Sequence, residues 1–418
     1  MLSVLVANIV GPNGIAIEPH PRRKDGTIHL EFANAIRGLY RDWCKRPEVT
    51  WSHDWASAQR IAARSWIRDG EFLAQYITGT GPTINHGTRV PFSIELIESD
   101  FLPFTHNSYE NPVIFAGVER NTWGKPIAYW VYKQHPGDIF RIPVQLSDLK
   151  RVPSDRMLHP KLVDRIGQDR GVSVFASVLG RLDDVKDYEE SERIAAKVAA
   201  CMAAYIKKGT PDTYDPTQDA EQRQLKFRSG LIFDDLRPGE DVGVIDTSRP
   251  NTQLEAFRNG QLRAVASGTG VTYSSLSKNY NGTYSSQRQE LVEGWGAYQI
   301  ICADFTSQFV RPVYEQFLEV AISSGQLVIP SDLDVDSLDS ALFIGPQMPW
   351  IDPGKEAKAW EMLERNGHAS GPEIVRRRGH NPQDVLEQER TWRQQWKEAD
   401  MTNSADPAND RPAPTPIR

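Results

Sequence analysis

The sequence predicts an α+β protein, in which an N-terminal region with a small antiparallel sheet precedes a largely helical remainder. Two stretches, 32–44 and 55–68, carry apolar residues at helical spacing. Short runs of β-forming residues separated by turn residues follow between residues 70 and 133. From Val174 onward, the chain contains long stretches of strong helix formers. With 418 residues, the chain is long enough for two or three domains and a sizeable core.

The N-terminal helices are predicted by two apolar faces, formed by Phe32, Ile36, Leu39, Tyr40 and Trp43 and by Trp55, Ala58, Ile61, Ala62 and Trp66. Strands are expected at 70–77, 91–98, 111–119 and 125–133, with a hairpin turn at 121–124 between the last two. Met1–Val10 is apolar but lacks the basic start and cleavage site of a signal peptide. We therefore expect a buried strand or helix end there.

The composition excludes several classes of protein. The chain has 55 acidic and 48 basic residues, a net charge of −7, which disfavours a strongly basic nucleic-acid binder. Hydrophobic residues make up 39% of the chain, so global disorder is not expected. The three cysteines, Cys44, Cys201 and Cys302, form no CxxC pair, which argues against a zinc module or a disulfide scaffold. No apolar run is long enough to span a bilayer.

The helical remainder is predicted to contain a helix pair around a polar insert. Residues 188–208 lack glycine and proline and are rich in alanine, so one helix is expected over the whole stretch. The insert at 209–250 is too short for a large core of its own. A second helix is expected at 254–266, then a polar loop at 274–286. A long helix at 287–323 should bend or break near its residues Gly294, Gly296 and Pro312.

The C-terminal region is predicted to hold short helices at 354–366, 371–378 and 382–397. Residues 406–418 contain four prolines and almost nothing apolar, so disorder is expected there. The basic cluster Arg376–Arg378 ends a predicted helix. Complementarity to the helix dipole and a solvated face explain it better than a nucleic-acid contact does.

Sequence signatures of catalysis are absent. The chain has no P-loop, no HExxH and no GxSxG motif, and its nine histidines are dispersed. The acidic run 332–336 superficially resembles a calcium loop. Position six is Ser337 instead of glycine and position twelve is Phe343 instead of glutamate, so a polar turn before a strand is expected. We predict no enzymatic activity, no metal and no cofactor.

Several multi-residue motifs in a fixed order resemble the portal proteins of tailed phages, in particular the lambda family. They are RIGQDRGV (165–172) followed by YEESERIAAKVAA, FRNGQLRAVASGTGVTYSSLSKNY (257–280), YSSQRQELVE (284–293), FVRPVYEQFLE (309–319), PWIDPGKEAKA (349–359) and GVERNTWGKPIAYWV (117–131). The resemblance covers nearly the whole chain. In that family, a further N-terminal stretch usually precedes the segment that corresponds to 2–14.

The resemblance implies a ring-forming portal fold with named parts. By position, these parts would be a wing at 1–180, a first stem helix at 181–208, a clip at 209–250, a second stem helix at 251–270, a tunnel loop at 271–286, a kinked helix with the rest of the wing at 287–350, a crown at 351–400 and a disordered tail at 401–418. A clip too small to fold alone would be completed by its neighbours in a closed ring.

The resemblance also implies a function: a portal of a tailed phage or prophage, a ring, typically a dodecamer, at the capsid vertex of the virion. The ring would form the channel for packaging and ejection of double-stranded DNA. Its partners would be the terminase large subunit, the head–tail connector, the major capsid protein and the scaffold, with assembly in the host cytoplasm and no membrane contact.

The implied site residues fall in two groups. The DNA-facing tunnel loop would contain Lys278, Asn279, Tyr280, Asn281, Gly282 and Tyr284, and the terminase- or connector-facing clip would contain Arg223, Lys226 and Arg228. The acidic net charge suits a conduit, because tight phosphate binding would hold DNA in place. Two alternatives remain open: a non-catalytic head–tail adaptor ring, and an unrecognised nuclease or hydrolase.

Overall fold

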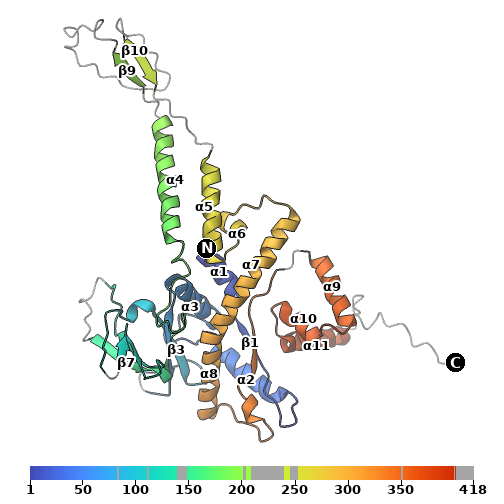
Figure 1. The fold of residues 1–418 in the computed structure, drawn as a ribbon. Coiled ribbons are helices and arrows are strands. Elements are labelled where there is room, and N and C mark those ends of the chain that lie inside the picture. The colour runs from blue at the N-terminus through green and yellow to red at the C-terminus, as the bar shows by residue number, and fades with distance from the viewer. Residues whose placement is uncertain are drawn as a thin grey trace, which may run out of the picture. The chain divides into compact units, whose positions relative to one another are not determined.

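The computed structural model describes residues 1–81, 84–110, 113–138, 148–200, 204–208, 240–244, 253–349, 352–399 and 401. They divide into two compact units (Figure 1). The first unit consists of Met1–Ala176 and Thr269–Arg418, and the second of Ser177–Gly268. The clip residues Arg223, Lys226 and Arg228 and the expected C-terminal disorder lie outside the described residues.

The core of the first unit is aromatic and lies between helices and a small sheet. The helices are α1 (Leu2–Ile9), α2 (Leu30–Trp43), α3 (Trp55–Asp69), α7 (Tyr284–Phe305) and α8 (Arg311–Ser323). Trp43 stacks on Phe92 with ring centroids 5.5 Å apart, and its indole Nε1 donates to the Phe92 carbonyl at 2.9 Å. The predicted helices at 32–44 and 55–68 are confirmed, and so is a buried helix at the N-terminus.

The named strands that the structure describes in the first unit pair in antiparallel fashion, as predicted. One sheet has the order β3-β2-β8, from Phe92–Glu98, Phe72–Thr78 and Met157–Leu158. A second has the order β4-β5-β6-β7, from Val113–Phe115, Val118–Arg120, Pro126–Tyr132 and Leu149–Pro153. Strands β1 (Ala16–Pro19) and β11 (Ala341–Ile344) form a further pair.

The strand predicted at 111–119 is wrong, because this stretch is a hairpin. Ala116 and Gly117 separate β4 from β5 and have φ angles of 47° and 81°. Two consecutive residues with positive φ form the tight turn whose twist matches that of a two-stranded ribbon. The apolar run concealed the turn, since only the glycine in it signals a reversal.

The long helix is continuous through Gly294 and Gly296, contrary to expectation. Its irregularity is a π-helical turn at Thr306–Val310, between α7 and α8, immediately before Pro312. Proline has no amide hydrogen to donate to the carbonyl four residues earlier, so a regular α-turn is interrupted there. The predicted irregularity near Pro312 is thus confirmed, whereas neither glycine interrupts the helix.

The second unit is an antiparallel helix pair, α4 (Leu179–Ala200) and α5 (Leu254–Thr269, whose last residue belongs to the first unit), extended by two strands. Arg181 Nη1 donates to Gln261 Oε1 at 3.2 Å, and Arg258 pairs with Glu189 at 2.6 Å. Strands β9 (Ala204–Lys208) and β10 (Glu240–Val244) are paired in register from Ala204 opposite Val244.

The prediction of one helix over 188–208 is therefore wrong at its C-terminal end, and α4 also begins nine residues earlier. Residues 204–208 contain Tyr and Ile, which favour strands. Pairing with residues 240–244 overrides the intrinsic helix preference of the alanine-rich sequence.

The predicted C-terminal helices are confirmed as α9 (Pro353–Arg365), α10 (Gly371–Arg377) and α11 (Pro382–Glu398). The side chains of Asp352, Ser370 and Asn381 cap their N-termini. Arg376, however, is not part of a solvated face. Its Nε and Nη2 donate to the buried carboxylate of Glu18 at 2.7 and 3.1 Å, which attaches α10 to β1.

Candidate functional site

The predicted tunnel loop is shorter than expected and is bounded by helices. Residues Tyr273–Ser277 form the short helix α6, and α7 begins at Tyr284. The loop itself is residues 278–283, so Lys278, Asn279, Tyr280, Asn281 and Gly282 lie in it, as predicted. Tyr284 lies on the first turn of α7 instead.

Local hydrogen bonds shape the loop. Lys278 has a left-handed backbone, φ 56°, which ends α6. The Asn279 amide donates to Ser277 Oγ at 3.2 Å, and the Asn281 amide donates to Asn279 Oδ1 at 3.0 Å. Thr283 caps α7 by accepting from the Ser286 amide at 3.3 Å. Hydrogen bonds from side chains within and beside the loop thus define its backbone conformation.

The side chains of the loop that face solvent are of several chemical types: one cation, amides and phenol rings. Tyr280 is 58% exposed and Tyr284 is 55% exposed, and Lys278, Asn281 and Gly282 are also exposed. A single cation, amides and phenol rings can contact phosphates and sugars briefly without forming a dense cationic site. The loop therefore has the chemistry of a weak polynucleotide contact.

The base of the loop is seated on α7. The Ser274 amide donates to Glu290 Oε1 at 3.0 Å, and the Thr272 amide donates to the Tyr298 hydroxyl at 3.4 Å. A Cβ atom added at Gly294 would lie 2.4 Å from Thr272 Cγ2, whereas one at Gly296 would meet nothing within 4 Å. The absence of a side chain at Gly294 leaves room for the Thr272 methyl group. This packing contact explains the glycine, although the helix does not bend there.

These two glycines make a matched test. We expect Gly296→Ala to stabilise the protein by about 0.5–1 kcal/mol, because alanine is the better helix former. Gly294→Ala gains the same propensity but crowds Thr272, so a net loss of about 1–2 kcal/mol is expected. Thermal denaturation of both variants measures the difference. Equal melting temperatures would contradict the seating of α6 on α7.

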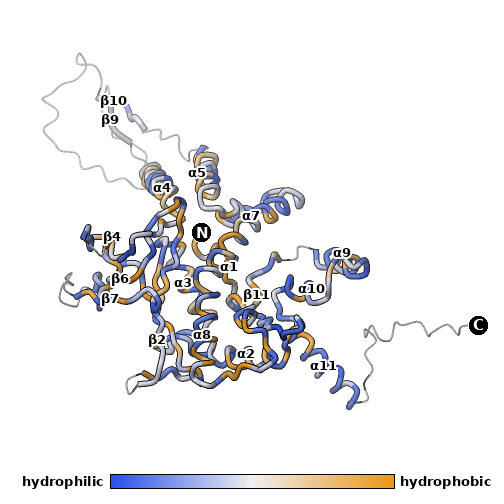
Figure 2. Tube along the Cα trace, turned by 60° about the horizontal axis from the view of Figure 1, so that its bottom comes forward, coloured by the Kyte–Doolittle hydropathy of each residue, from blue (hydrophilic) through white to orange (hydrophobic). Residues whose placement is uncertain are grey.

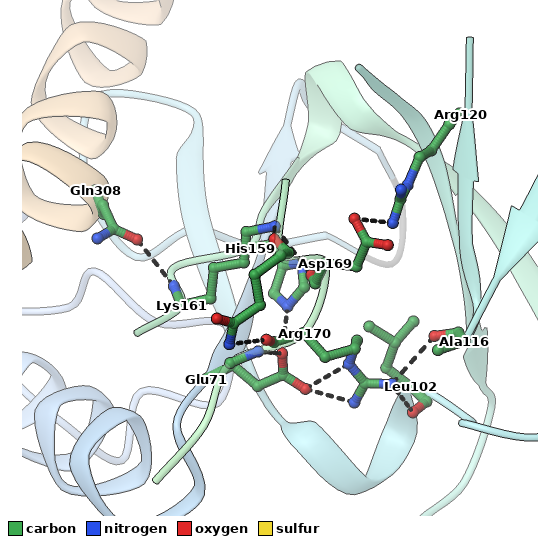
Figure 3. A network of polar contacts seen from close by, with 11 residues as sticks. Glu71, Leu102, Ala116, Arg120, His159, Lys161, Asp169, Arg170 and Gln308 are labelled. Carbon is green, nitrogen blue, oxygen red and sulfur yellow. Dashed lines mark hydrogen bonds and ion pairs between the residues drawn. The ribbon is translucent and has the colours of Figure 1, made fainter. Parts of the chain in front are cut away.

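A buried polar network lies within the motif RIGQDRGV (Figure 3). Arg170 Nε donates to Glu71 Oε1 at 2.6 Å, and its Nη1 donates to the carbonyls of Leu102 and Ala116 at 3.0 and 3.1 Å. The other carboxylate oxygen of Glu71 accepts from the Gly171 amide at 2.6 Å and from His159 Nε2 at 2.9 Å. We call Glu71, His159 and Arg170 the buried triad.

The electrostatics of the triad favour an ionised Glu71 and a neutral His159. Burial alone would raise the pKa of Glu71, but hydrogen bonds from His159 and Arg170 and the charge of Arg170 outweigh it and lower the pKa to about 2. Burial lowers the pKa of His159 more than Glu71 raises it. At neutral pH, His159 is therefore an uncharged imidazole that carries its proton on Nε2 and donates it to Glu71.

The same loop is tied to the long helix. Lys161 Nζ donates to the carbonyls of Gln168 and Asp169 at 3.0 and 2.9 Å, and the Lys161 amide donates to Gln308 Oε1 at 2.9 Å. Gln308 lies in the π-helical turn. Asp169 also pairs with Arg120 of β5. The motif therefore joins strands, a hairpin and the long helix at one buried point.

Acid should weaken this junction in a defined pH window. Because the pKa of Glu71 is about 2 in the folded state and near 4.5 ordinarily, its contribution is complete above pH 4.5 and is lost as the pH falls toward 2. We expect Glu71→Gln to be less stable at neutral pH and to lack this dependence. Urea denaturation across the window measures it. The exposed Glu110→Gln is the control, and an unchanged pH profile in Glu71→Gln would refute the assignment.

Sequence reasoning noted the motif but missed its role. Glu71 and His159 carry no local signal, because each is an isolated polar residue and Glu71 is 99 residues from Arg170. Gly171 is required for packing, since a Cβ there would lie 2.0 Å from the Gly70 carbonyl oxygen. A glycine directly after the arginine of the motif was therefore a sequence signal of tight backbone packing at this point.

Comparison with known proteins decides the family. The sequence profile described as "Phage portal protein, lambda family" matches residues 1–301. The chain belongs to this family. The probable portal protein of Halomonas phage phiHAP-1 is 27% identical over 398 residues, which cover 92% of this chain and 75% of that protein. This is a portal protein of a phage, and the portal fold implied by its motifs is confirmed.

Other matches are more distant in sequence. Portal protein B of Escherichia phage lambda is 24% identical over 307 residues, which span 66% of this chain and 57% of that protein. Among solved structures, a chain in the neck of an empty GTA particle has a TM-score of 0.45 and 12% identity. The alignment covers 91% of this portal chain and 94% of that chain.

Portal proteins are structural components of the virion. Within the described part of the chain, no group of three or more His, Cys, Asp or Glu residues is placed to hold a metal ion. None of the helices that the structure describes is long and apolar enough to cross a membrane.

Proposed function

We propose that copies of this portal protein form a closed ring, a dodecamer, at the capsid vertex, through which double-stranded DNA enters and leaves the particle. The observation that carries the proposal is the second unit, which exposes apolar surface that one chain does not cover. Leu179, Ile194 and Phe257 of the helix pair are all more than 40% exposed. Burial of such side chains between neighbouring subunits would stabilise a ring.

The strand pair supports the same proposal. Among the described residues, β9 and β10 pair only with each other. An isolated two-stranded ribbon is marginally stable in water. Contacts with neighbouring subunits would supply the packing that this ribbon lacks. Arg223, Lys226 and Arg228 belong to the insert at 209–250, in the part of the sequence that separates β9 from β10. We propose that this insert faces the terminase large subunit during packaging and the head–tail connector afterwards.

The loop at 278–283 would face the channel. Its exposed Lys278, Tyr280, Asn281 and Gly282, its half-buried Asn279, and Tyr284 on the adjoining helix can touch passing DNA without binding it tightly. A net charge of −7 per chain also opposes tight retention of DNA in a ring. The N-terminal sheets would contact the major capsid protein and the scaffold during assembly in the host cytoplasm, and no catalytic activity or cofactor is required of the chain itself.

The ring is tested by native mass measurement of the purified protein. A ring of twelve 47.1 kDa chains weighs about 565 kDa. A monomer under all assembly conditions would refute the ring. Image averages that lack an extended helix pair around the axis would instead favour a head–tail adaptor, and intrinsic nuclease activity would favour an enzyme.

A further inference from the structure

The three C-terminal helices have almost no core of their own. In α9, α10 and α11 together, only Pro382 is buried, and in α9 only Glu356 and Trp360 are even half-buried. Helices of this length are marginal in water unless an apolar face packs against something. Their uncovered faces therefore indicate a missing neighbour.

Two separate apolar patches lie on these helices. The α9 patch consists of Met362, 63% exposed, and Leu363. The α11 patch consists of Trp392, which is 53% exposed, and Trp396, which packs against it edge to face with ring centroids 5.6 Å apart. Figure 2 shows the C-terminal part of α11 running away from α9. The two patches do not cover each other within one chain.

Ion pairs hold the patches in fixed positions on their own subunit. Arg376 binds Glu18 with two hydrogen bonds, and Asp384 at the start of α11 pairs with Arg37 and Arg41 of α2 at 3.6 and 3.1 Å. Burial alone would raise the pKa of Glu18, but hydrogen bonds from His20 and Arg376, together with the Arg376 charge, outweigh it and lower the pKa to about 2. The helices are thus attached by polar contacts on one side, which leaves the apolar patches for a partner.

The sequence limits what that partner is. Residues 402–418 contain four prolines and, among large aliphatic or aromatic residues, only Ile417, so this segment is too polar to cover both patches. Helix α9 carries three basic and three acidic residues, and α11 carries three basic and four acidic residues. Two copies can therefore approach each other without strong charge repulsion.

We propose that the α9 patch of one subunit packs on the α11 patch of the next subunit. This inference rests on the proposed ring. A chain with two different apolar patches uses each of them once in a head-to-tail contact, and such contacts close when the rotation between subunits is that of a ring. A two-fold contact would instead pair each patch with itself.

Cysteine crosslinking of the full chain tests this arrangement. Met362→Cys/Trp392→Cys is treated with a short bismaleimide, whose reach tolerates contacts that disulfide geometry would miss. We expect a ladder of covalent oligomers up to the full ring. The single variants and the wild type, which keeps Cys44, Cys201 and Cys302, should give no ladder. A mixture of the two single variants should give covalent dimers that contain one chain of each kind.

Each other result overturns the proposal in a distinct way. Covalent homodimers from one single variant would show a two-fold contact, and an internally crosslinked monomer would show that the patches meet within one chain. Intact rings of the double variant without a ladder would refute the contact and leave the ring standing, with a different virion protein as the occupant. Absence of both rings and crosslinks would refute the ring and the contact together.

Discussion

Replacing Arg170 with alanine is expected to destabilise the first unit by about 3–5 kcal/mol, because it leaves a buried carboxylate without its charge partner. Glu71 is 1% exposed, and the Leu102 and Ala116 carbonyls would lose their donor at the same time. Since Lys161 links the motif to Gln308 in the π-helical turn, we expect fewer rings as well as a lower melting temperature. Thermal denaturation and native mass measurement provide the two readouts.

Arg165→Ala is the matched control, because Arg165 lies in the same motif but is exposed. It should change stability by less than about 0.5 kcal/mol. Arg170→Lys keeps the charge but loses the planar fork, so an intermediate loss is expected. If the melting temperature of Arg170→Ala matched that of Arg165→Ala, the buried triad would not be a stabilising junction.

Deleting Asn279–Gly282 is expected to reduce DNA-filled particles to near background while rings still assemble. The deletion spares Thr283, which caps α7, and Ser274, which is bonded to Glu290. The remaining Lys278 and Thr283 form a two-residue connection, which is enough to join two helices. The exposed side chains that would contact DNA are removed, whereas the residues that seat the loop remain.

Nuclease-protected DNA in assembled particles measures packaging, and native mass measures the ring. Lys278→Ser/Tyr280→Ser keeps the loop length and removes the cation and one aromatic ring. It therefore distinguishes an effect of the side chains on packaging from an effect of loop length. Loss of rings in the deletion variant would make the loop a structural joint, and normal packaging would refute its position in the channel.

Elements with a strong local pattern were predicted closely. The apolar faces at 32–44 and 55–68 gave α2 and α3 within two residues, because burial of one face requires that spacing. The C-terminal helices were predicted within one residue at each end, and each has a capping residue before it and a proline in its first turn. In each case the signal lies within the element itself, so neighbours in space were not needed.

Predictions failed where a distant segment decides the backbone. Residues 204–208 have a sequence compatible with a helix, but pairing with 240–244 makes them a strand. The glycines at 294 and 296 suggested a bend, yet Gly294 accommodates Thr272, the residue before α6. Both outcomes depend on tertiary contacts, which the helix propensities of individual residues do not describe.

The candidate site divides in the same way. The polar, exposed loop at 278–283 was predicted from its composition, although its boundary moved when Tyr284 proved to be helical. The buried triad was not predicted, because Glu71 and His159 have no motif around them. Arg376 was assigned to a solvated face but binds Glu18, a residue 358 positions earlier.

The sequence alone determined the α+β class, most helices, the antiparallel strands and, through the order of its motifs, the family. Only the tertiary structure decided that Arg170, Glu71 and His159 form one junction, and that the C-terminal helices are attached by charge with their apolar patches uncovered. The physical reason is that helix and strand signals are local in the chain. The free energy of a buried charge or an exposed apolar side chain is instead set by what surrounds it in space.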